Sequence, residues 1–269
     1  MNTCRIGNVA FGGGKLALIA GPCTAESLDL CLKVAQTLAE ICRKLQIGYV
    51  FKASYDKANR TSGARPRGPG MSQGLEWLAE VRRRVGVPVL SDVHDVAQVS
   101  PAAAVLDCLQ VPAFLCRQTD LLLAVGNSGK AVNIKKGQFV SPANMEFAVE
   151  KVRSTGNDNV LLTERGACFG YDLLVNDFRC VPIMQQFAPV VFDATHSVQQ
   201  PGKGEVTGGQ RQFVPVLARS AVAAGADALF IETHPDPDHA LSDAACQWPL
   251  DQMEELLKRC VEIYRAARA

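Results

Sequence analysis

The 269-residue sequence predicts a (β/α)₈ barrel, an architecture in which about 250 residues form eight parallel strands ringed by helices. Eight short runs rich in aliphatic residues alternate with longer stretches of helical character. The short runs are apolar on both faces, which is typical of parallel strands covered on each side. An open doubly wound sheet is the alternative, but it usually holds fewer strands in a chain of this length.

The strands that we expect, in chain order, are Leu16–Ala20, Tyr49–Lys52, Pro88–Ser91, Val105–Gln110, Ala131–Ile134, Val160–Thr163, Val190–Phe192 and Ala228–Ile231. Apolar residues recur at helical spacing between them and predict the helices Leu28–Leu45, Gly74–Val85, Asp120–Val125, Met145–Val152, Phe213–Ala224 and Leu250–Ala267. The helix between the third and fourth strands is short and weakly marked.

The first fifteen residues precede the first expected strand and form an N-terminal arm, residues 1–15. Gly12–Gly14 has the composition of a tight turn, and Arg5–Phe11 is expected to form a small hairpin that closes the bottom of the barrel. The sequence contains no internal repeat, low-complexity tract or linker. Residues 1–269 are therefore expected to form a single barrel domain.

Composition limits the partners and the compartment. Hydrophobic residues make up 48% of the chain, enough for a large core, and 28 basic residues nearly balance 27 acidic ones. This balance argues against a nucleic-acid or membrane-surface protein, which needs a basic excess. The sequence shows neither a signal peptide nor an apolar run of about 18 residues. Ten scattered cysteines without a C-x-x-C pair favour free thiols and a cytoplasmic location.

Every expected strand ends in a charged or reactive polar group, and the active sites of such barrels lie at these carboxyl ends. Three of the four histidines, His94, His196 and His234, directly follow strands. Each alone is most simply a hydrogen-bonded histidine at the rim, but three at one level of the fold indicate a shared site. The groups that follow the strands are Cys23, Lys52, Asp92, Gln110, Lys135, Glu164, Arg165, Asp193 and Glu232.

Three of these residues, Cys23, His196 and Glu232, are candidate metal ligands, with Asp243 as an optional fourth. One thiolate, one imidazole and one or two carboxylates suit a borderline divalent ion such as Zn²⁺, Fe²⁺ or Mn²⁺ better than Mg²⁺ or Ca²⁺. The spacing carries no motif because the ligands come from different strands. For Cys23 the alternative is a small buried residue after Gly-Pro.

The segment 51–70 is a basic loop with five cations and one carboxylate, Asp56. It is either a solvated loop or part of a phosphate site, because Lys135, Arg165 and Arg117 project from the same expected rim. Converging guanidinium and ammonium groups suit phosphate oxygens. No nucleotide-binding glycine motif follows a strand, so we expect one or two phosphorylated small molecules.

Several of these motifs resemble those of the 3-deoxy-D-manno-octulosonate 8-phosphate synthases. The resemblance runs from about Leu18 to Leu250 and is carried by Lys52-Ala-Ser-Tyr-Asp-Lys-Ala-Asn-Arg60, Gln110-Val-Pro-Ala-Phe-Leu-Cys-Arg-Gln-Thr-Asp120 and Phe192-Asp-Ala-Thr-His-Ser-Val-Gln-Gln-Pro-Gly202. It implies a barrel, usually a homotetramer, that condenses phosphoenolpyruvate with arabinose 5-phosphate. The products are an eight-carbon sugar acid phosphate, which feeds lipopolysaccharide synthesis, and inorganic phosphate.

The resemblance also implies roles for individual residues. Cys23 stands where the metal-free branch of the family has asparagine, and Ser242-Asp243-Ala244 also resembles the metal-dependent branch. The implied metal ligands are Cys23, His196, Glu232 and Asp243. The implied phosphoenolpyruvate contacts are Lys52, Lys57, Gln110, Lys135, Arg165 and Arg117, the last from this or a neighbouring subunit. The implied arabinose 5-phosphate contacts are Asn59, Arg60 and Thr61, with Asp92 and His94 in the middle of the cavity.

Proton transfer and two rival functions stay open at this stage. His196 cannot act as a base while it binds a metal, so Asp92 with His94, or Asp243, are the candidate proton carriers. A related synthase that uses erythrose 4-phosphate typically has Lys-Pro-Arg-Thr where this chain has Lys57-Ala-Asn-Arg60. A non-catalytic sugar-phosphate-binding barrel is the rival of another class, and it predicts a rim in which some candidate ligands are replaced.

Overall fold

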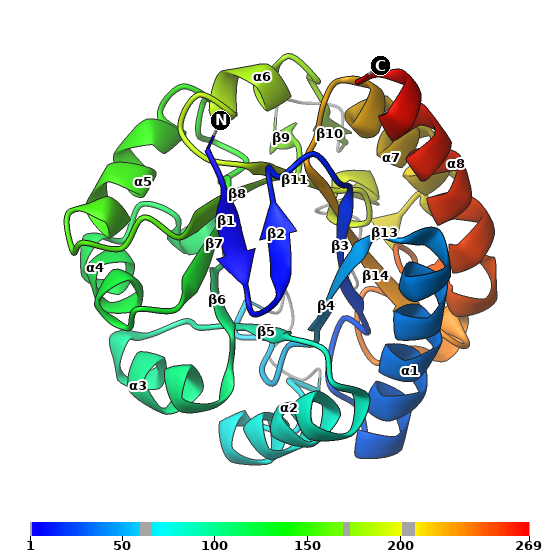
Figure 1. Ribbon diagram of the computed structural model, residues 1–269. Coiled ribbons are helices and arrows are strands. Elements are labelled where there is room, and N and C mark those ends of the chain that lie inside the picture. The colour runs from blue at the N-terminus through cyan, green and yellow to red at the C-terminus, as the bar shows by residue number, and fades with distance from the viewer. Residues whose placement is uncertain (1, 60–65, 169–172, 201–207, 269) are drawn as a thin grey trace.

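Eight parallel strands close into a barrel in the computed structural model, which describes residues 2–59, 66–168, 173–200 and 208–268 (Figure 1). Each strand pairs with the next, and β14 pairs with both β11 and β3, which completes the ring. The barrel strands are β3 (Ala17–Gly21), β4 (Gly48–Lys52), β5 (Val89–Asp92), β6 (Cys108–Val111), β7 (Ala131–Lys135), β8 (Val160–Glu164), β11 (Val190–Asp193) and β14 (Ala228–His234). The predicted fold class is confirmed, and the open-sheet alternative is wrong.

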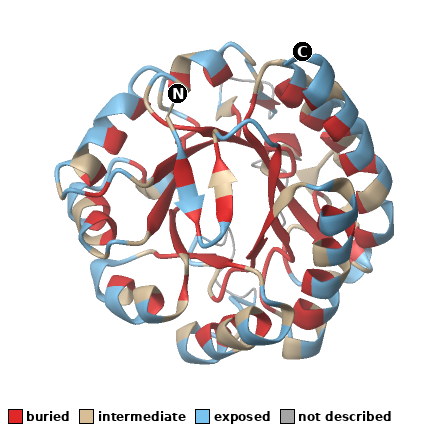
Figure 2. Cartoon of the chain, viewed as in Figure 1, coloured by how far each residue is buried: buried red, intermediate tan, exposed pale blue. Residues whose placement is uncertain are grey.

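Helices cover the outside of the barrel and turn one apolar stripe toward it (Figure 2). In α1 the side chain of Ser27 caps the first turn, and the inner stripe includes Val34, Leu38 and Ile41 at helical spacing. The helices are α1 (Leu28–Leu45), α2 (Met71–Val85), α3 (Val96–Val105), α4 (Thr119–Asn127), α5 (Met145–Arg153), α6 (Cys180–Met184), α7 (Val214–Ala223) and α8 (Met253–Ala266). None of the described helices is long and apolar enough to cross a membrane.

Short elements occupy the loops at the carboxyl ends of the strands. The two-residue strands are β9 (Ala167–Cys168), β10 (Leu174–Val175), β12 (Gln199–Gln200), β13 (Gly208–Gly209) and β15 (Trp248–Pro249). Single 3₁₀ turns span Ala113–Leu115, His196–Val198, Arg211–Phe213, Pro237–His239 and Leu250–Gln252.

Two expectations about the elements need correction. The fourth barrel strand begins at Cys108 rather than Val105, because α3 continues through Val105 and the Leu106 amide still bonds the carbonyl of Ala102. The short helix α6, between the sixth and seventh strands, was not expected. Its five residues are too few to show helical periodicity.

The N-terminal hairpin consists of β1 (Cys4–Ile6) and β2 (Val9–Phe11), paired antiparallel. Its inward side chains, Cys4, Ile6, Val9 and Phe11, pack in one cluster with apolar residues from inside the barrel. Figure 1 looks onto this end and shows the hairpin across the opening. The expected plug is confirmed, although Gly12–Gly14 leads into β3, and the chain reverses at positions 7 and 8 instead.

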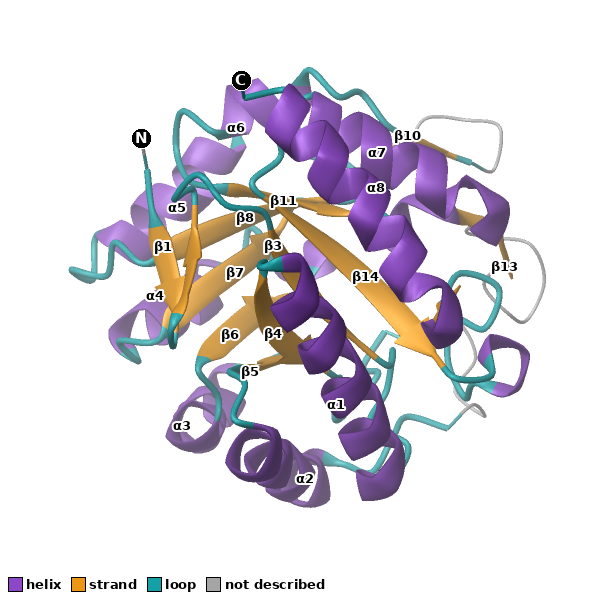
Figure 3. Cartoon of the chain, turned by 45° about the vertical axis from the view of Figure 1, so that its right-hand side comes forward, coloured by secondary structure: helices purple, strands orange, loops and turns teal. Residues whose placement is uncertain are grey.

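The barrel interior changes from apolar to polar along the strands. Alternate residues of a strand point inward, and the first inward residues, such as Ile19, Val50, Leu90 and Leu161, join the hairpin cluster. The last inward residues are instead polar: Lys52, Asp92, Gln110, Lys135, Asp193 and Glu232. Figure 3 shows the hairpin at one end of the strands, while the β14 arrow points to the other end. The polar groups therefore gather opposite the plug.

Candidate active site

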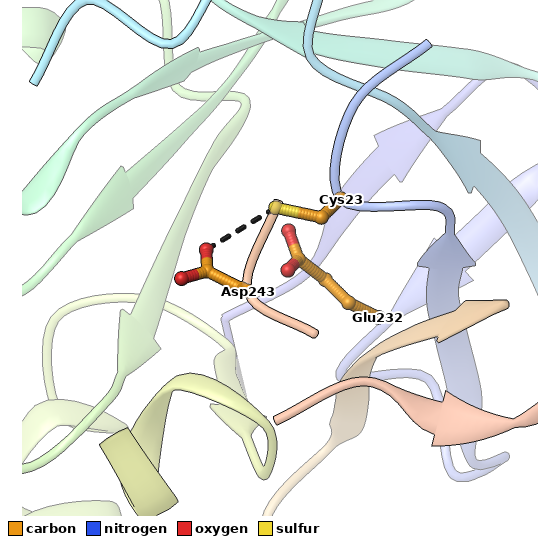
Figure 4. A group of neighbouring side chains, drawn as sticks. All are labelled: Cys23, Glu232 and Asp243. Atoms are coloured by element: carbon orange, nitrogen blue, oxygen red, sulfur yellow. Dashed lines mark hydrogen bonds between the residues drawn. The ribbon is translucent and has the colours of Figure 1, made fainter. Parts of the chain in front are cut away.

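Cys23, Glu232 and Asp243 meet at the carboxyl end of the barrel (Figure 4). One ligand atom from each lies within 4.8 Å of the others, and the Cys23 thiol donates to Asp243 Oδ2 at 3.2 Å. Cys23 follows β3, Glu232 lies on β14, and Asp243 lies in the loop after β14. Pairing of β3 with β14 brings these segments together although more than 200 residues separate Cys23 from Glu232.

His196 completes the group from the neighbouring strand end. Its Nε2 lies 3.7 Å from Glu232 Oε2, and its Nδ1 lies 2.6 Å from Asp193 Oδ2. Asp193 is fully buried and also accepts a hydrogen bond from the His196 amide at 2.8 Å. A carboxylate on one ring nitrogen fixes the direction of the other, as it does for metal-binding histidines. The structure therefore turns Nε2 of His196 toward the Glu232 carboxylate, which belongs to the three-residue cluster of Cys23, Glu232 and Asp243.

The residues present fit a divalent metal ion. Glu232 Oε2 is buried and has no hydrogen-bond partner among the described residues. Burial raises the pKa of the Cys23 thiol, and the nearby carboxylates of Glu232 and Asp243 raise it further. A cation among these groups would offset both effects, since it pairs the free oxygen and favours the thiolate. One sulfur, one imidazole nitrogen and two carboxylates match the borderline ions predicted from the sequence.

Lys52 holds the other oxygen of the Glu232 carboxylate. Its Nζ lies 2.6 Å from Glu232 Oε1 and donates to the carbonyl of Cys23 at 3.2 Å. Lys57 Nζ approaches the same oxygen to 3.9 Å. Burial alone would raise the pKa of Glu232, but Lys52, His196 and Lys57 outweigh it and hold that pKa well below its usual range. Glu232 is therefore an anion that faces lysines on one side and the candidate metal position on the other.

A hydrogen-bonded chain of polar side chains crosses the barrel beside this cluster. Ser54 and Gln110 both donate to Asp92, Asn133 donates to Gln110 at 2.9 Å, and Thr163 donates to Asn133 at 2.7 Å. Burial would raise the pKa of Asp92, but Lys52, Lys57 and His94 lower it more, so that Asp92 stays ionised. His94 meets the ring of Tyr55 edge-on, and its Nδ1 is buried without a partner in the described parts of the chain.

Two buried cations follow β7 and β8. Lys135 Nζ lies 2.5 Å from Asp193 Oδ2 and 4.3 Å from the centre of the Phe230 ring. Burial lowers the pKa of Lys135, and the pair with Asp193 only partly offsets this. Arg165 donates to Gln199 Oε1 at 2.6 Å, while its Nη1 is buried and unpaired within the described ranges. An anionic ligand would pair with this Nη1 of Arg165.

The structure does not bring every predicted site residue to this mouth. Asn59 is exposed in the loop after β4, and Arg117 is exposed just before α4. Neither side chain bonds another candidate residue in the described part of the chain. Arg60 and Thr61 lie outside the described residues.

Residues that the sequence reasoning did not single out also shape the site. Gln247 is fully buried, accepts a hydrogen bond from the Cys23 amide at 3.2 Å, and donates to the Ser242 carbonyl at 2.9 Å. Ser242 Oγ lies 3.0 Å from Cys23 Sγ. Gln199 joins Arg165 to Asp243. Their only signal in the sequence was closeness to nominated residues: Ser242 and Gln247 lie one and four positions from Asp243, and Gln199 lies three positions from His196.

A barrel with buried ions and hydrogen-bonding side chains at its carboxyl end has the form of a barrel enzyme. The model of the DAHP synthetase I family matches residues 3–268, and the chain belongs to that family.

Curated relatives give a more specific likeness, since they share the name 2-dehydro-3-deoxyphosphooctonate aldolase. The protein from Desulfotalea psychrophila is 57% identical over 97% of this chain and 94% of its own length. The protein from Syntrophotalea carbinolica is 57% identical over 97% of this chain and 96% of its own. The protein from Granulibacter bethesdensis is 58% identical over 94% of this chain and 91% of its own.

Proposed function

We propose that the chain condenses phosphoenolpyruvate with D-arabinose 5-phosphate and water, which gives 3-deoxy-D-manno-octulosonate 8-phosphate and inorganic phosphate. The observation that carries this proposal is the set of buried cations Lys52, Lys135 and Arg165 beside the cluster of Cys23, Glu232 and Asp243, with His196 next to Glu232. The name shared by the curated relatives supports the eight-carbon product. The product serves lipopolysaccharide synthesis.

The two rival functions are less well supported. A synthase for the seven-carbon product would use erythrose 4-phosphate, but the curated relatives are named for the eight-carbon one. A binding barrel without activity would have no need for a hydrogen-bonded set of ions at the mouth, since each buried charge costs free energy.

We propose that Cys23, His196, Glu232 and Asp243 hold a divalent metal ion, either Zn²⁺, Fe²⁺ or Mn²⁺. When bound, the ion supplies positive charge that orients and modestly polarises a substrate oxygen, because a thiolate ligand limits its Lewis acidity. Asp193 positions His196, and Gln247 positions the backbone of Cys23.

The chain's own cations bind and orient the substrates. Lys52, Lys57, Lys135 and Arg165 surround phosphoenolpyruvate and offset its negative charge, and the neutral amide of Gln110 also contacts it. Asn59, Arg60 and Thr61 bind arabinose 5-phosphate. Fixed charges of this kind hold two anionic reactants in a near-attack geometry. C3 of the enol then bonds to the sugar aldehyde carbon, water adds at C2, and the C–O bond to phosphate breaks.

Proton transfer falls to groups beside the reacting carbons. The lowered pKa of Asp92 makes it a weak base near neutral pH, so its charge orients neighbours and stabilises positive charge. His94 has a free buried Nδ1 and lies two residues after Asp92 in the chain, which makes this pair the first candidate. Asp243 is the second candidate, because its carboxylate lies in the cluster with Cys23 and Glu232.

Phosphate release tests the proposed reaction directly. With phosphoenolpyruvate present, we expect rapid release with arabinose 5-phosphate and far slower release with erythrose 4-phosphate, before metal stripping and after metal is restored. Equal or faster release with the four-carbon sugar would favour the rival synthase. Binding of phosphoenolpyruvate without any release would favour the non-catalytic barrel.

We also propose that the protein is a homotetramer. Phe114, Phe139 and Phe147 lie on or beside the loops after β6 and β7 and are 56%, 57% and 59% exposed. Large exposed apolar groups in neighbouring loops mark contact surfaces, and Arg117 lies three residues from Phe114. Light scattering should give about four times the chain mass of 28.9 kDa. A stable monomer at micromolar concentration would refute the tetramer.

The cysteines bear on where the enzyme works. All ten are free thiols, and nine of them are buried. Free thiols persist in a reducing compartment, so we propose that the protein acts in the cytoplasm. In this proposal the binding partners of the protein are its two small-molecule substrates, and they include neither nucleic acid nor a membrane.

A further inference from the structure

One amide side chain joins the two halves of the candidate site. Gln199 accepts a hydrogen bond from Arg165 Nη2 at 2.6 Å through Oε1, and it donates from Nε2 to Asp243 Oδ1 at 3.3 Å. The opposite amide orientation would turn donors toward the guanidinium and the oxygen toward the carboxylate, so the two charges fix this orientation. Gln199 thus spans a candidate phosphate-binding cation and a candidate metal ligand.

The backbone on both sides of this bridge is held in place. Gln199 begins β12 and pairs with Gly209 in β13, where any side chain would collide with Cys246 Sγ, since an added Cβ would lie 2.2 Å from it. Asp243 has a left-handed backbone with φ of 47°, and its carbonyl accepts from the amides of Cys246 and Gln247 at 2.8 and 3.1 Å. The same turn therefore supports Asp243 and β13, the strand that pairs with Gln199.

Each end of the bridge faces a position where a ligand would bind. Arg165 is 5% exposed, and its Nη1 has no partner within the described residues. At the other end, Asp243 Oδ2 faces Cys23 in the three-residue cluster. An anion at Nη1 would fix Arg165, and a cation beside Oδ2 would fix Asp243. Because Gln199 bonds both residues, the ligand that binds first orders the bridge, and the second ligand pays less to order it.

We propose that Gln199 is a positioning residue that couples the binding of a phosphorylated ligand at Arg165 to the binding of a divalent metal ion at Asp243. This inference rests on the proposed function, and it adds that the metal and the phosphorylated ligand regulate each other's binding at the same site. Because linkage is reciprocal, each ligand increases the affinity for the other by the same factor.

The test compares two neighbouring glutamines in the full-length protein. Gln199→Met keeps the side-chain length and removes both hydrogen bonds, whereas Gln200→Met makes the same change one residue along β12, where the side chain lies over Gly208. Calorimetry gives the Kd for phosphoenolpyruvate on metal-stripped and Zn²⁺-loaded protein. Competition with a chelator gives the Kd for Zn²⁺ with and without phosphoenolpyruvate.

In the wild type and in Gln200→Met we expect each ligand to tighten the other by about tenfold, within the usual range of coupling between sites. The coupling ratio is the Kd for one ligand without the other ligand divided by its Kd with the other ligand bound. In Gln199→Met we expect this coupling ratio to fall to within about twofold of one, whatever the thermal stability of the variant. A coupling ratio of about tenfold in Gln199→Met, or a coupling ratio of about one in the wild type, would overturn the inference.

Phosphate release from the same samples separates this inference from the proposed function. A wild-type protein that shows the ratio but releases no phosphate would contradict the reaction and support the coupling. A protein that releases phosphate without the ratio would contradict the coupling alone.

Discussion

Cys23→Ala is expected to lose its bound metal and to lose activity by more than about 100-fold. Changes to groups that merely support a metal ligand cost about 10–100-fold, so removal of a ligand costs more. Metal content by mass spectrometry and initial rates of phosphate release measure the two effects. A chelator should inactivate the wild type, and Zn²⁺, Fe²⁺ or Mn²⁺ should restore it.

Cys31→Ala is the matched control. Cys31 is also buried, but it lies on the inner face of α1 and packs in the hydrophobic core rather than in the cluster of candidate metal ligands. It should keep its metal and its rate. The metal assignment fails if the wild type keeps full activity after exhaustive chelation, which would place the chain with metal-free enzymes despite its cysteine.

Lys52→Met is expected to lower the free energy of unfolding of the metal-stripped protein by about 3–5 kcal/mol, the usual cost of removing one partner of a buried pair. Lys52 and Glu232 are both about 1% exposed, and their charged atoms lie 2.6 Å apart. The methionine fills the space but leaves the carboxylate without its closest cation. Denaturant unfolding measures the loss, and phosphate release should fall as well because Lys52 faces the substrate.

The double variant Lys52→Met with Glu232→Gln separates charge from packing. Removing both charges should recover part of the lost stability while activity stays low. If the double variant is as unstable as the sum of the two single variants, the two groups act independently, and the ion-pair explanation is wrong.

The barrel could be predicted from the sequence because its strands are buried on both faces. Runs such as Ala228–Ile231 are apolar throughout, and both the inner and outer clusters of the core use them. The boundary at Val105 could not be predicted, since a valine between Ala104 and Leu106 suits the end of a helix as well as the start of a strand. Helix α6 was missed because one and a half turns carry no period.

Three of the candidate metal ligands were nominated from the predicted topology, whereas Asp243 was added by the resemblance to the family. Cys23, His196, Glu232 and Asp243 follow no spacing rule, but a closed parallel barrel brings every strand end to one mouth. Strand alternation would also have placed Asp193 inside, two residues after the inward Val191. The amide bridges of Gln199 and Gln247 depend on loops that fold back over the mouth, and no local pattern specifies such contacts.

The plugged end of the barrel determines how reactants and products travel. Ile6 and Phe11 of the hairpin are fully buried against the barrel lining, so the axis is closed on that side. Both substrates, the sugar acid product and the released inorganic phosphate must then pass through the one open end of the barrel. Their order of binding and release is therefore interdependent. A ligand bound at that open end would block the release of any molecule held deeper in the barrel. Product inhibition therefore follows from the architecture itself.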